Sequence, residues 1–182
     1  EGKTLLDQFL LARRVIEAGA RCVTLAFTRW PFGRMLSGDF NWDWHKDIFT
    51  EARGTLPLLD LGLSAMIRDL EERGLLDDIA VVAWGEFGRT PKINKAKDGG
   101  RDHWSQAYCA QFAGGGIAKG RVLGATDAHA AEVTDHPLSP KDMLATMYHL
   151  LGIDPHATLP DKVGRPQPML PEGSHVVTEM LA

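Results

Sequence analysis

The sequence predicts an α/β fold in which helices form layers around a mainly parallel central sheet. Helical and strand-like segments alternate along the chain, which is the order of elements that such folds produce. Residues 79–84 are almost continuously apolar, as expected for a parallel strand that is covered on both faces. We expect a single domain over residues 1–182, because a chain of 182 residues is long enough to bury one core and shows no clear internal boundary.

The helices are predicted from apolar residues that recur at helical spacing. This pattern covers residues 4–16 and, most clearly, residues 56–73. A third helix is expected over residues 139–151, where Ser139 is suited to be the N-cap and Pro140 the first helical residue.

The remaining segments are expected to be strands and loops. Short apolar runs predict strands at residues 21–27, 79–84 and 106–113. Residues 28–47 form a long loop, which in a compact domain is usually functional or disordered. Residues 155–182 are rich in Pro and Gly and are expected to be a largely irregular tail.

Composition excludes several classes of protein. The formal net charge of −4 argues against a protein that binds nucleic acid through a basic surface. No apolar run approaches the roughly 20 residues that a membrane-spanning helix needs. Cys22 and Cys109 each lie in an apolar run, so we expect buried free thiols and no disulfide between them. The oligomeric state is not readable from these features.

The first polar cluster lies in the long loop. Asp43 and His45 are two residues apart, so in an extended segment both side chains point the same way. A carboxylate oxygen and an imidazole nitrogen together suit zinc or a similar divalent ion. The alternative is a surface loop in which Asp43 caps a turn and His45 is solvated.

The second cluster directly follows the strand at residues 79–84. Ligands of open α/β sheets bind beyond the carboxyl ends of the strands, which favours a functional role for Glu86. Three residues later, the guanidinium of Arg89 is suited to a bidentate grip on phosphate or sulfate. The alternative is a surface ion pair between these two side chains, which would contribute little to stability.

The third cluster occupies residues 100–104. It offers the imidazole of His103, the carboxylate of Asp102, which could orient that imidazole as its partner, and the guanidinium of Arg101 as another group for an anion. The alternative is a solvated loop.

The three clusters together resemble a known family. Trp-Asp-x-His at 42–45, Gly-Glu-Phe-Gly-Arg-Thr-Pro at 85–91 and Gly-Arg-Asp-His-Trp at 100–104 occur in that order, followed by Gly-Gly-Gly-Ile at 114–117 and Gly-Ala-Thr-Asp at 124–127. This order resembles the sulfatase-like family of unknown function 1501 of planctomycete-type bacteria, which is placed in the alkaline phosphatase superfamily.

The resemblance implies a layered fold of the alkaline phosphatase and sulfatase type. It implies that Asp43, His45 and His103 bind one metal ion and that Glu86 stands at the position of a second, where Phe87 replaces the usual His. It also implies that the nucleophile and a further metal-binding Asp come from an N-terminal part of the domain. We expect that part to precede this chain, which begins within a helix at Glu1, so no nucleophile is nominated here.

The predicted function is therefore the metal-dependent hydrolysis of phosphate or sulfate esters. Its cofactor would be a divalent metal ion, either zinc or one like manganese or calcium, and Arg89 and Arg101 would neutralise the anionic ester. The alternative is a non-catalytic binding or surface-associated domain that keeps the fold without the activity. The resemblance also implies an exported, periplasmic protein.

Overall fold

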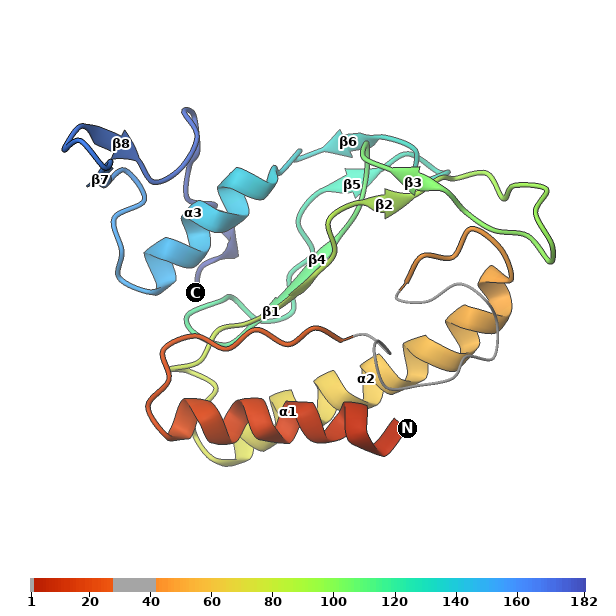
Figure 1. Cartoon of the computed structure of the whole chain (residues 1–182), viewed down its shortest axis with the longest axis horizontal. Coiled ribbons are helices and arrows are strands. Elements are labelled where there is room, and N and C mark those ends of the chain that lie inside the picture. The colour runs from red at the N-terminus through yellow and green to blue at the C-terminus, as the bar shows by residue number, and fades with distance from the viewer. Residues whose placement is uncertain (1, 28–41) are drawn as a thin grey trace. The chain divides into compact units, whose positions relative to one another are not determined.

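The computed structural model describes residues 2–27 and 42–182 (Figure 1). The chain divides into two compact units, the first comprising Glu1–Leu75 and Gly85–Tyr108 and the second Leu76–Trp84 and Cys109–Ala182. Each unit combines helices with short antiparallel strands, so the fold is mixed α/β. No helix in the described part of the chain is both long and apolar enough to cross a membrane.

The first unit is built on two helices that pack side by side, α1 (Gly2–Glu17) and α2 (Ile48–Glu72) (Figure 1). The buried ring of Phe9 lies directly over Gly62, where a Cβ atom would come within 2.3 Å of Phe9 Cε2. Beside this contact, Nε of the buried Arg13 lies 2.8 Å from Asp69 Oδ2. The small residue at position 62 thus permits the close approach of the two helices.

Both predicted helices of this unit are present, but α2 begins eight residues earlier than expected, at Ile48 rather than near residue 56. The start of α2 is held by hydrogen bonds to residues distant in sequence, which the spacing of apolar residues cannot reveal. The backbone N–H groups of Asp47 and Ile48 donate to the carbonyl oxygens of Lys97 and Gly99, both at 3.1 Å. Pro57, which usually marks a first turn, therefore lies inside the helix.

A hairpin completes the first unit. Its strands, β2 (Gly88–Arg89) and β3 (His103–Trp104), pair antiparallel and place Arg89 opposite His103. The strand expected at residues 21–27 is absent, because none of the described residues pairs with this run. Of the long loop expected at 28–47, residues 28–41 lie outside the described residues, and residues 42–47 are irregular.

The second unit contains the pair β1 (Val81–Trp84) and β4 (Ala110–Ala113), which occupy two of the predicted strand segments (Figure 1). They pair antiparallel, with Val81 opposite Ala113 and Trp84 opposite Ala110. The mainly parallel central sheet is not found, since the strands of the described residues form four two-stranded antiparallel sheets. Residues 85–108, which connect the two strands, belong to the first unit and contain a hairpin, not a crossover helix of the kind that usually joins parallel strands.

Two further hairpins belong to the second unit. One pairs β5 (Ala125–Thr126) with β6 (Val133–Asp135), and the other pairs β7 (Thr158–Pro160) with β8 (Pro166–Pro168). The second hairpin lies within the tail that was expected to be largely irregular.

Helix α3 (Pro140–Leu150) begins as predicted, with Ser139 as N-cap and Pro140 in the first turn. The Asp142 carboxylate accepts hydrogen bonds from the Ser139 backbone N–H at 3.1 Å and from its hydroxyl at 2.5 Å. The C-terminal segment, including η1 (Thr178–Met180), packs on this helix. Its core consists of Ile117, Met143, Val177 and Met180.

Cys22 and Cys109 are both free, as expected, but both are exposed, so the prediction that they are buried is wrong. The apolar runs that contain the two cysteines are therefore not buried along their whole length. Alternate residues of a β-strand point to opposite faces, and in β4 Gln111 is exposed while Phe112 and Ala113 are half-buried.

We predict that Gly62→Ala lowers the free energy of unfolding. A methyl group at this position overpacks the Phe9 ring, at a cost of about 1–3 kcal/mol, whereas Ala gains roughly 1 kcal/mol over Gly in a helix. Urea unfolding measures the difference. Asp60→Ala, at an exposed position of the same helix, is the control and should leave the stability unchanged or slightly higher. A Gly62→Ala variant as stable as the wild type would contradict this packing.

We also predict that Thr146→Val destabilises the second unit by about 1–3 kcal/mol. The fully buried Thr146 hydroxyl donates to Asp142 O at 2.8 Å and accepts from the Val177 backbone N–H at 3.0 Å, so valine leaves that N–H without its acceptor. Thr146→Ser keeps the hydroxyl and should retain more of the stability. Urea unfolding together with amide hydrogen exchange at Val177 tests this, and equal protection in both variants would count against it.

Candidate metal centre

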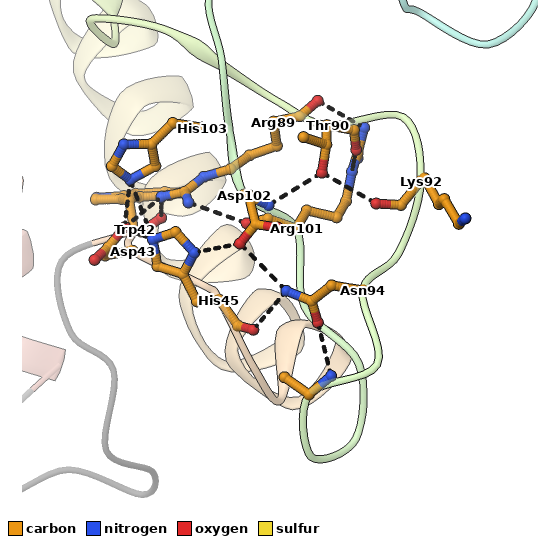
Figure 2. Close-up of polar contacts among 11 residues, drawn as sticks. Trp42, Asp43, His45, Arg89, Thr90, Lys92, Asn94, Arg101, Asp102 and His103 are labelled. Atoms are coloured by element: carbon orange, nitrogen blue, oxygen red, sulfur yellow. Dashed lines mark hydrogen bonds and ion pairs between the residues drawn. The ribbon is translucent and has the colours of Figure 1, made fainter.

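Three predicted ligands meet in the first unit. One donor atom from each of Asp43, His45 and His103 lies within 4.8 Å of the others (Figure 2). Asp43 Oδ1 is 2.8 Å from His103 Nε2 and 2.9 Å from His45 Nε2, and the two Nε2 atoms are 3.2 Å apart. Asp43 and His45 come from the segment that precedes α2, and His103 comes from β3.

The local backbone explains why the two nearby ligands point the same way. Trp44, between them, is buried, whereas the side chains of Asp43 and His45 are 53% and 40% exposed. The side chains of Asp43 and His45 therefore share the exposed side of the segment, but this segment is a turn and not the extended chain that the spacing assumed, since the His45 N–H donates to Asp43 O at 3.1 Å.

The donor set fits a divalent ion of the zinc type. Tetrahedral zinc with bonds of about 2.0–2.1 Å separates its ligand atoms by roughly 3.3 Å, so the observed distances of 2.8–3.2 Å require only a small outward movement. One carboxylate and two imidazoles leave a further coordination position. Three protein ligands with an open position are typical of catalytic rather than structural zinc sites.

Hydrogen bonds keep the carboxylate of Asp43 ionised. The hydrogen bond from His103 lowers the pKa of Asp43 below its ordinary value, and the hydrogen bond from Arg89 adds to this effect against the opposing effect of burial. The ionised form of this carboxyl group is therefore favoured over the protonated form more than in an isolated Asp side chain.

Asp102 contacts His45 and not its neighbour His103. Its Oδ1 lies 2.7 Å from His45 Nδ1, so it bonds to the imidazole nitrogen that faces away from the other two donors (Figure 2). The sequence predicted an orienting carboxylate at this position but suggested the imidazole next to it in the chain. The hydrogen bond from His45 also lowers the pKa of Asp102.

Arg89 holds the hairpin to the segment at residues 42–47, whereas the Arg101 side chain contacts the hairpin itself. The Arg89 guanidinium donates to Trp42 O, to Arg101 O at 3.1 Å and to Asp43 Oδ1 at 3.2 Å. Arg101 donates to Thr90 O and, at 3.1 Å, to Arg89 O. Arg89 thus borders a ligand oxygen, while Arg101 contacts backbone carbonyl groups. Binding of an anion by either side chain stays a prediction.

Glu86 does not belong to the group of three donors, and its side chain is exposed. Its neighbour Phe87 instead packs on the candidate ligand His103, with 4.1 Å between the centroids of the two rings. The Arg89 guanidinium lies 5.9 Å from the same phenyl ring. A role for Glu86 as a metal ligand stays a prediction. The contact of Phe87 with His103 has no counterpart in the sequence pattern.

Comparison with known families adds one finding. Residues 2–181 match the family described as "Protein of unknown function (DUF1501)". The chain belongs to this family. No curated protein and no solved structure matches the chain. The DUF1501 assignment confirms that part of the resemblance, while the link to sulfatases and alkaline phosphatases stays a prediction, and the description of DUF1501 assigns no activity.

Proposed function

We propose that this DUF1501 chain carries the metal site of a hydrolase that acts on phosphate or sulfate esters. The observation that carries the proposal is the convergence of Asp43, His45 and His103 from two segments distant in sequence. The proposal includes a layered fold of the alkaline phosphatase and sulfatase type, and it assigns the nucleophile to none of the described residues.

The chain's own residues have separable roles in this proposal. Asp43, His45 and His103 would hold a divalent ion, which in such sites polarises the ester oxygen and stabilises the charge that develops on it. Arg89, 3.2 Å from Asp43 Oδ1, supplies fixed positive charge beside the ligands and would favour an anionic substrate. Zinc suits the two imidazole ligands best, with manganese or a calcium-like ion as the alternative.

A second candidate is a binding domain that keeps the metal-site geometry without catalysis. The position of Phe87 favours it, because an apolar ring covers one side of His103 and offers no group that could take part in acid–base chemistry. The two candidates differ in turnover. Hydrolysis of 4-nitrophenyl phosphate or sulfate by the intact protein, lost in His45→Ala, favours the hydrolase, and metal binding without turnover favours the binding domain.

We predict that the purified chain binds close to one equivalent of zinc or manganese. His45→Ala and His103→Ala each remove one of three donors and should weaken this binding by more than about 100-fold, since even loss of an outer partner of a ligand costs 10–100-fold. Isothermal titration with Zn²⁺ and Mn²⁺, together with elemental mass spectrometry, measures affinity and stoichiometry.

His136→Ala is the matched control for this experiment. His136 is an exposed histidine paired with Asp135 at 3.0 Å and lies in the other unit. It should bind metal as the wild type does. A wild-type protein that binds neither ion after reconstitution, or ligand variants that bind as tightly as His136→Ala, would refute the site.

A further inference from the structure

A network of hydrogen bonds lies behind His45 on the side away from the other ligands. Asp102 Oδ1 is 2.7 Å from His45 Nδ1, and Asn94 Nδ2 donates to the same oxygen at 3.3 Å. Asn94 Nδ2 also donates to the backbone oxygen of His45 at 3.0 Å. One amide group therefore contacts both partners of the Asp102–His45 pair (Figure 2).

The hairpin loop fixes Asp102 and Asn94 in turn. The Asp102 backbone N–H donates to Thr90 Oγ1 at 3.0 Å, and the Thr90 hydroxyl donates to Lys92 O at 3.0 Å. Asn94 Oδ1 accepts from the Ala96 backbone N–H at 3.0 Å, which orients its amide with Nδ2 toward Asp102. Since both ends of the amide are engaged, Asn94 and Thr90 restrict where the Asp102 carboxylate can lie.

The contact with Asp102 identifies one nitrogen of His45 that carries a proton. A carboxylate accepts hydrogen bonds and does not donate them, so the pair at 2.7 Å requires a proton on His45 Nδ1. A neutral imidazole with its proton on Nδ1 presents an unprotonated Nε2. That atom faces Asp43 and His103, where a metal ligand must carry a lone pair. In the metal-free protein the Nε2–H of His103 can donate to Asp43 Oδ1 at 2.8 Å and also faces His45 Nε2 at 3.2 Å, and this proton must leave His103 Nε2 before that nitrogen can bind a metal ion.

We infer that Asp102 is a positioning residue that fixes the tautomer and ring orientation of His45 for metal binding, and that Asn94 and Thr90 hold Asp102 in this role. The inference rests on the proposed metal site. Asp102, Asn94 and Thr90 would not bind the metal ion or the substrate themselves, and they would affect metal binding only through His45.

A second Asp–His pair in the chain supplies an internal comparison. Asp135 Oδ1 lies 3.0 Å from the Nδ1 of the adjacent His136, and both side chains are about 60% exposed. These two residues are neighbours in sequence, whereas Asp102 and His45 are separated by 57 positions. Replacing either aspartate makes the same chemical change, but only Asp102 contacts one of the three donors.

The first test measures metal affinity by titration with Zn²⁺, and with Co²⁺ followed by its visible absorption. Asp102→Ala should weaken binding by about 10–100-fold, the usual effect of removing the partner of a histidine ligand. Asp102→Asn keeps an acceptor oxygen and should lose less, and Asn94→Ala should change affinity in the same direction. Asp135→Ala should leave affinity within about twofold of the wild type.

The second test reads the tautomer in the metal-free protein, by ¹⁵N NMR of histidine side chains at a pH where the imidazoles are neutral. His45 should carry its proton on Nδ1 in the wild type and shift toward the Nε2-protonated form in Asp102→Ala. The signals of His136 should change only in Asp135→Ala. A general loss of structure would alter many histidine signals at once, so thermal unfolding of each variant is compared in parallel.

The outcomes separate the inference from the proposed function. A wild type that binds no metal refutes the metal site, while a tautomer that depends on Asp102 still supports the positioning role. Metal binding that is as tight in Asp102→Ala as in Asp135→Ala overturns the inference and leaves the site standing. An unchanged proton on His45 Nδ1 in a folded Asp102→Ala variant overturns it as well.

Discussion

The candidate metal centre depends on the antiparallel pairing of β2 with β3. This register places Arg89 opposite His103, and the guanidinium then reaches Trp42 O and Asp43 Oδ1 in a segment far away in sequence. Gly88 permits close packing beside this pairing, because a Cβ at this position would come within 2.0 Å of Ala107 O. A hairpin only two residue pairs long thus brings together Asp43 and His103, two candidate ligands separated by 60 positions.

Backbone hydrogen bonds add a second constraint on the same geometry. The Arg101 N–H donates to Trp44 O at 2.9 Å, and the Asp47 N–H donates to Lys97 O at 3.1 Å, so the segment at residues 42–47 is attached to the hairpin at two points. Gly100 lies so close to this segment that a Cβ there would come within 1.9 Å of His45 O. Because these contacts use the main chain, the ligands are preorganised independently of any bound ion, which lowers the entropic cost of forming the site.

Local patterns in the sequence predicted those parts of the site that depend on local geometry. The spacing of Asp43 and His45 was enough to predict that their side chains share one face, and clustering of polar residues singled out His103. The partner of Asp102 could not be predicted in this way, because its contact with His45 depends on the hairpin register and on a separation of 57 positions. Nothing in the local pattern distinguished Glu86 from Phe87 as the side chain that approaches His103.

The fold shows the same division between local and non-local information. The apolar runs located β1 and β4, and capping residues located the start of α3 at Ser139. Strand direction was predicted wrongly, because apolar continuity measures burial and carries no information on which way a neighbouring strand runs. The early start of α2 depends on hydrogen bonds to residues 97–99, about fifty positions further along the chain, which a helical pattern cannot contain.

The charges of the site bear on what kind of ligand the metal-loaded form would attract. Asp43 and Asp102 both have lowered pKa values and are ionised near neutral pH, while Arg89 contributes one positive charge. With the neighbouring Arg101 guanidinium included, the two carboxylates and two guanidinium groups sum to zero, so the metal-free cluster has no net charge. A divalent ion would leave two net positive charges at the site. Metal binding would therefore come before the binding of an anionic ester, because only the loaded site would present a positive field to it.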